Sequence, residues 1–97
     1  MPSIFLDYAV ATSIRNHTPH DTNALPGNTI GISCVVTTAG ILKVLMHCDS
    51  SAAEIDLGLG THFIDGNFKL VYSTGSTAVL TGTRVTAYIA NPANSNY

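Results

Sequence analysis

The chain has 97 residues, of which 45% are apolar, 10% are charged and the net charge is −2. Its four cations are scattered along the sequence, which argues against a nucleic-acid partner because a phosphate-backbone binder needs clustered Lys and Arg. No apolar run approaches the roughly 18 residues that a membrane helix needs. The first residues show no basic stretch before an apolar one, so we expect no signal peptide.

Residues 1–28 are predicted to hold an N-terminal strand or arm followed by a long connector. The stretch IFLDYAV, residues 4–10, alternates as a strand does, although the spacing of apolar residues over 6–14 also fits a helix face. We favour the strand because the rest of the chain has strand character. Residues 15–28 contain two prolines and a Pro-Gly pair, which indicates irregular structure. Loops of this length are often functional or arm-like.

The connector also contains the best metal candidates, which are His17, His20 and Asp21. Zinc and similar ions need three or four converging ligands. A proline between the two histidines disfavours the helix that would bring them together, and the remaining ligands would have to be His47 or His62. A weaker alternative is a site on a symmetry axis with one histidine from each of several subunits. We therefore expect loop histidines, with no metal and no cofactor.

Residues 29–49, TIGISCVVTTAGILKVLMHCD, predict a β-hairpin. Apolar residues alternate on both arms, and Thr38-Ala39-Gly40 fits a three-residue loop with its glycine in the left-handed region. This register pairs Cys34 with Val44 and separates Cys34 from Cys48 by roughly 13 Å along the strands, too far for a disulfide. We expect two free, buried thiols that act as small core residues.

Residues 55–72 predict a second hairpin around the turn pair Asp65-Gly66, with Phe63 opposite Phe68 on the core face. Glu54 and Asp56 fall on the opposite, solvated face. Two carboxylates so placed are conceivable in a hydrolase, but a solvated strand face is the preferred interpretation. The chain contains no nucleophile elbow and no complete dinucleotide loop, so we expect no enzymatic activity.

Residues 73–90 allow two interpretations. Thr74-Gly75 and Thr81-Gly82 are either both turns around a short strand, or Gly82 is a bulge in one long strand. In both cases alternate residues from 85 to 89 face the core. A proline at 92 ends the strand, and residues 91–97 form a polar tail. The whole chain, residues 1–97, is thus predicted to be one all-β domain, a small antiparallel β-sandwich or barrel of about 6–8 short strands with an irregular N-terminal connector.

A small, charge-poor β-domain rich in Thr, Ala, Gly and Asn resembles bacteriophage virion proteins, in particular capsid decoration (cement) proteins and tail-associated β-domains. The resemblance lies in general character and assigns no catalytic, cofactor-binding or metal-binding residue. It implies a structural protein, made in the host cytoplasm and located in the virion, whose partners are copies of itself and/or capsid proteins, with no nucleic acid and no membrane. The alternative is a receptor- or carbohydrate-binding β-sandwich of a phage tail or cell surface.

Overall fold

A computed structural model describes residues 11–90, and the all-β class predicted from the sequence is confirmed. The strands are β1 (Ala11–His17), β2 (Thr29–Thr38), β3 (Gly40–Met46), β4 (Ala53–Leu57), β5 (Gly60–Asp65), β6 (Phe68–Val71), β7 (Val79–Leu80) and β8 (Val85–Ala90), with the 3₁₀ turn η2 (Thr81–Thr83) before β8. The expectations for a strand at 4–10 and a polar tail at 91–97 lie outside the described residues.

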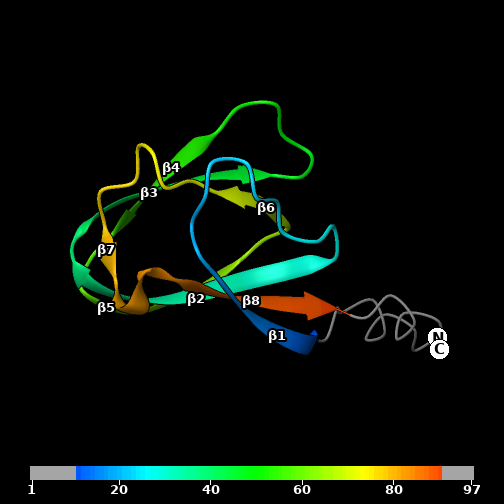
Figure 1. Cartoon of the computed structure of the whole chain (residues 1–97), viewed down its shortest axis with the longest axis horizontal. Coiled ribbons are helices and arrows are strands. Elements are labelled where there is room, and N and C mark those ends of the chain that lie inside the picture. Colours follow the sequence, from blue (N-terminus) through cyan, green and yellow to red (C-terminus); the bar gives the residue numbers. More distant parts are fainter. Residues whose placement is uncertain (1–10, 91–97) are drawn as a thin grey trace, which may run out of the picture.

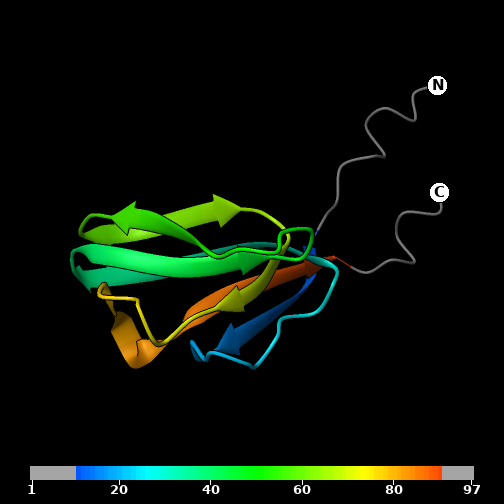
Figure 2. The same cartoon turned by 90° about the horizontal axis from the view of Figure 1, so that it is seen from above.

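The strands form two antiparallel sheets that face each other as a sandwich (Figure 1). Sheet A has the order β1-β8-β2-β5, and the short β7 pairs with the far end of β2 on the same side as β8. Sheet B has the order β4-β3-β6. From above, the orange β8 lies beside the blue β1 (Figure 2). Of the two predicted architectures, the sandwich is therefore the one that forms.

A single hydrophobic core fills the space between the sheets. Successive strand residues point to opposite faces, so alternate positions of β2, β3 and β8 supply most of it. Phe68, at the start of β6, is its largest fully buried side chain. The buried apolar residues are Leu25, Ile32, Cys34, Val36, Leu42, Val44, Leu57, Phe68, Val71, Leu80, Val85, Ala87 and Ile89. Burial of each large side chain among them contributes about 1.5–3 kcal/mol to stability.

The first predicted hairpin is wrong in its pairing. β2 pairs with β5, β7 and β8 in sheet A, whereas β3 pairs with β4 and β6 in sheet B, so Cys34 lies opposite His62 and not opposite Val44. The chain crosses between the sheets at Ala39, the single residue that separates the two strands. Gly40 does not have the left-handed φ that a hairpin loop requires. Glycine is required at position 40 for a different reason, because a Cβ there would lie 2.6 Å from the backbone nitrogen of Ala78.

The second predicted hairpin is also wrong, because β5 belongs to sheet A and β6 to sheet B. The turn at Gly66 carries the chain across the sandwich, and its N–H donates to the carbonyl of Ile30 at 2.9 Å. The inward residues of β5 are the half-buried His62 and Ile64. Phe63, expected in the core, is instead 57% exposed on the outside of sheet A.

The N-terminal connector is shorter than predicted and is fixed in place. β1 continues to His17, so irregular backbone begins at Thr18. The connector then follows the free side of β6, where the His20 N–H donates to the Val71 carbonyl at 2.8 Å and the Leu25 N–H to the Lys69 carbonyl at 2.7 Å. The connector therefore extends sheet B in place of a fourth strand.

The last part of the described chain follows the interpretation with two turns. Gly75 and Gly82 both have positive φ, 90° and 68°, and the short strand β7 lies between them. The prediction for β8 is confirmed, because Val85, Ala87 and Ile89 are all buried.

Candidate functional site

The connector residues that suggested a metal site have structural hydrogen bonds. The Nδ1 atom of His20 accepts the backbone N–H groups of Thr22 and Asn23 at 3.1 and 3.2 Å. The Asp21 carboxylate accepts the N–H groups of Ser73 and Thr74 at 3.1 and 2.9 Å. These bonds favour the charged carboxylate and lower the Asp21 pKa from 3.8 to about 2, with Thr74 as the largest cause. Asp21 thus joins the connector to the turn after β6.

The other proposed metal ligands do not join them. Within residues 11–90, no group of three or more His, Cys, Asp or Glu side chains is placed to hold a metal ion. The Nε2 atom of His62 lies 2.8 Å from the carbonyl oxygen of Gly58, at the turn before β5. His17 is partly buried, and this desolvation lowers its pKa. The Nε2 atoms of His17 and of His47, which follows β3, are buried without a hydrogen-bond partner in the described part of the chain.

The two thiols differ in their surroundings. Cys34 is buried in the core, where desolvation raises its pKa, and Cys48 is exposed after β3. Both are free, as predicted, but the expectation that both are buried is wrong for Cys48. Glu54 and Asp56 are exposed on the outward side of β4, where Glu54 lies opposite Lys43 of β3. Their solvated position agrees with the preferred interpretation of that strand.

The candidate functional surface is the face of sheet A that points away from the core, which we call the outer face. Its members follow from the register, because residues opposite each other in a ladder share a face. One register row joins Ile14, Tyr88, Gly31 and Asp65 across the four strands. The register and the continuation of β8 to Arg84 place the following residues on it: Ile14, Asn16, Gly31, Ser33, Val35, Thr61, Phe63, Asp65, Arg84, Thr86 and Tyr88.

An aromatic pair occupies the middle of the outer face. The rings of Phe63 and Tyr88 meet edge-to-face with centroids 5.1 Å apart. They reach each other across β2 because Gly31 has no side chain there, and a Cβ on it would lie 3.2 Å from the Phe63 ring. The Tyr88 hydroxyl is in turn hydrogen-bonded to the Ser33 hydroxyl at 3.1 Å. The pair is thus held in one orientation while Phe63 stays exposed.

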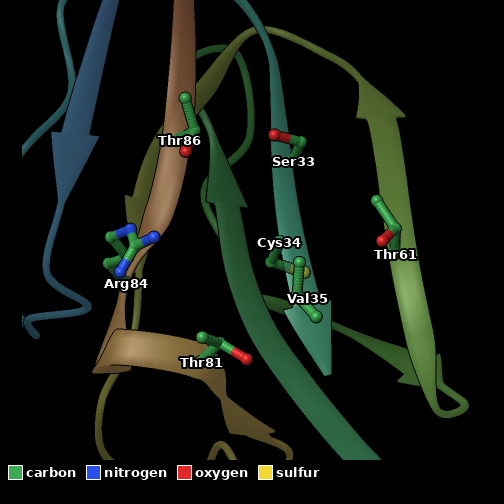
Figure 3. A pocket seen from close by; sticks show the side chains of 7 residues that line it. All are labelled: Ser33, Cys34, Val35, Thr61, Thr81, Arg84 and Thr86. Atoms are coloured by element: carbon green, nitrogen blue, oxygen red, sulfur yellow. The ribbon is translucent and has the colours of Figure 1, made fainter. Parts of the chain in front are cut away.

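Beside the aromatic pair lies a shallow hollow of about 70 Å³ (Figure 3). It exists because β2 pairs with β8 only as far as Ser33 and with β7 only from Val36. Between those points the chain leaves the sheet through η2, with left-handed φ at Gly82 and Thr83. The residues that line the hollow are Ser33, Cys34, Val35, Thr61, Thr81, Arg84 and Thr86. The lining is therefore hydroxyl-rich, with one guanidinium group.

The exposed large apolar residues are concentrated on one of the two sheets. The exposed large hydrophobic residues among the described ones are Ile14, Val35, Leu59, Phe63 and Val79. Four of them belong to strands of sheet A, and Leu59 is in the turn that enters β5. Sheet B instead presents Lys43, Glu54 and Asp56 outward. Sheet A thus exposes large apolar side chains together with hydroxyl groups and the charges of Arg15, Asp65 and Arg84.

The outer face was only partly visible in the sequence. Val35 could be placed outside, because its neighbours Cys34 and Val36 were predicted inside. Phe63 could not, because its side was derived from a hairpin pairing with Phe68 that does not form. The useful signal was Gly31, a glycine within a strand, which often marks a close approach by another group.

Among the described residues no helix is long and apolar enough to cross a membrane. Comparison of the chain with protein-family models, curated proteins and solved structures found no match.

Proposed function

We propose that this chain is a non-enzymatic structural protein of a virion, a bacteriophage capsid decoration protein in kind, which works by burying the outer face of sheet A on protein neighbours. The observation that supports this proposal is the concentration of the exposed large apolar residues on sheet A. A monomeric protein rarely exposes a large contiguous apolar patch, and such patches often mark interaction sites. The charge-poor composition and the resemblance to virion proteins point to the same class.

Phe63 is the expected centre of the contact. Interface energy is concentrated in a few central aromatic or Arg side chains, surrounded by neutral contacts that exclude water. Phe63 is 57% exposed, is supported by Tyr88 and has Val35 and the hydroxyl-lined hollow beside it. Because its ring is already oriented, little side-chain entropy is lost when a neighbour covers it.

The first prediction is that Phe63→Ser releases the protein from the particle. Purified empty shells of the virus that encodes the chain are mixed with each variant and sedimented, and the bound fraction is measured. We expect at least a roughly tenfold loss of bound protein, as for a central interface residue. Leu59→Ser is the matched control, because Leu59 is 70% exposed but lies in the turn before β5. Equal binding by both variants, or a gene located outside any viral region, contradicts the proposal.

A second candidate function is carbohydrate binding, which the exposed Phe63 ring beside the half-buried Tyr88 specifically favours. Sugars stack on exposed rings and accept hydrogen bonds from nearby hydroxyl groups, and Ser33 supplies one beside Tyr88. A glycan array separates the two functions: a defined glycan class that is lost with Phe63→Ser favours the recognition module, whereas shell binding without glycan binding favours the structural role.

A further inference from the structure

The outer face carries two charged residues at opposite corners. Asp65 ends β5 in the register row of Gly31. Arg84 precedes β8 in extended backbone, with φ −148° and ψ 157°, and so continues the outward series of Thr86 and Tyr88. With strands about 4.8 Å apart and residues about 3.3 Å apart, the two positions are separated by roughly 16 Å along a diagonal of the sheet. The point midway between them is Ser33 of β2.

We infer that the outer face binds the outer face of a second copy of this chain around a two-fold axis that passes over Ser33, with Arg84 of each copy on Asp65 of the other. This inference rests on the proposed function and names a second copy as the neighbour that covers the face, so that Phe63→Ser would reduce shell binding through loss of the dimer. When two identical faces pack around an axis in their common plane, residue i meets residue j and residue j meets residue i. An axis that exchanges Arg84 and Asp65 must run perpendicular to the line between them and through its midpoint, which is above Ser33.

The same axis accounts for the rest of the face. It brings Val35 of one copy near Phe63 of the other, so the two exposed apolar side chains cover each other. It also directs the partner copy's Asp65 carboxylate into the hollow, where Arg84 and the hydroxyls of Thr81 and Thr86 are the donors that a carboxylate needs. The strands of the two copies then cross at about 70°, near the orthogonal class of sheet packing.

Charge reversal tests this pairing. Sedimentation equilibrium of the full chain measures the dimer dissociation constant for Arg84→Glu, for Asp65→Arg and for the double variant. We expect each single reversal to weaken the dimer at least about tenfold, because it opposes like charges in a desolvated contact. The double variant restores the pair with reversed polarity and returns the dissociation constant to within about threefold of the starting value.

Two control variants and the shell-binding assay separate a failure of the dimer inference from a failure of the proposed function. Arg15→Glu and Asp56→Arg reverse exposed charges that lie off the outer face, opposite Ala87 and on sheet B, and are expected to leave the dimer unchanged. A wild-type monomer at several hundred micromolar, or a double variant no stronger than the singles, overturns the pairing. If shell binding still requires Phe63 in that case, the proposed function stands and the neighbour is a different protein. If Phe63→Ser affects neither assay, both inferences fail.

Discussion

Asp21 shows how a single exposed carboxylate can define the path of a long connector. It accepts hydrogen bonds from the Ser73 and Thr74 backbones and from the Ser73 hydroxyl, more than fifty residues away. Charged acceptors make stronger hydrogen bonds than neutral ones. The connector that contains the candidate metal ligands therefore has a structural role, because Asp21 holds it against the turn that follows β6 of sheet B.

The protonation of Asp21 predicts an acid transition in stability. Its pKa is lowered from 3.8 in the unfolded chain to about 2 in the folded one. The unfolded state then binds the proton more readily, so the stabilisation is complete above about pH 4 and is lost as the pH falls through about 2. We expect Asp21→Asn to be less stable than wild type at neutral pH and equal to it near pH 2.

Thermal melts of both proteins from pH 2 to 7 measure this difference. His17, whose lowered pKa also weakens the fold as acid protonates it, is present in both proteins and cancels from the comparison. Asp56→Asn is the control, since its exposed side chain lies on the outward side of β4. A gap between wild type and Asp21→Asn that stays constant with pH contradicts the assignment.

At the scale of elements, the sequence predicted where strands occur better than it predicted what they pair with. The alternation of apolar residues from Ile32 to Met46 stays in phase through Ala39. An in-phase pattern is compatible with a hairpin, but equally with one strand that bends from sheet A into sheet B. The packing of Gly40 against residues 77–78 favours the bent strand over the hairpin. This contact joins segments that are distant in the sequence, so the local apolar pattern cannot predict it.

That packing makes Gly40→Ala a specific test. The added Cβ would lie 2.6 Å from the Ala78 nitrogen and from the Thr77 hydroxyl oxygen, so backbone must shift. We expect a loss of about 1–3 kcal/mol in the free energy of unfolding, as for other overpacked sites. Gly58→Ala is the matched control, because nothing lies within 4 Å of its Cβ position and its φ is not left-handed. Chemical denaturation measures both, and equal stability of the two variants contradicts the bent-strand explanation.

At the scale of the whole molecule, the candidate face depends on pairings between distant segments. Among the described strands, β3 and β4 are the adjacent pair in sequence that also pair in a sheet, while β1 pairs with β8 and β2 with β5, β7 and β8. Composition and the apolar pattern predicted a small antiparallel β-sandwich or barrel, without deciding between the two. The outer face could not be predicted because its membership is set by partners that are 26 to 74 positions apart, from Val35 and Thr61 to Ile14 and Tyr88.

This topology predicts slow folding. Loop closure must precede most of the strand pairing, and domains dominated by such non-local pairs fold in about milliseconds to seconds. Stopped-flow circular dichroism after dilution from denaturant measures the rate, with Leu59→Ser as a control, because its side chain is 70% exposed in the turn before β5 and should leave the rate unchanged. Refolding within microseconds would contradict the dominance of non-local pairing.

The bend at Ala39 has a mechanical consequence. Because β2 and β3 are one continuous backbone, a tensile load that enters through sheet A reaches sheet B along covalent bonds. The two layers cannot slide past each other without straightening that crossing. A force applied to sheet A would therefore be transmitted to sheet B through the backbone at Ala39.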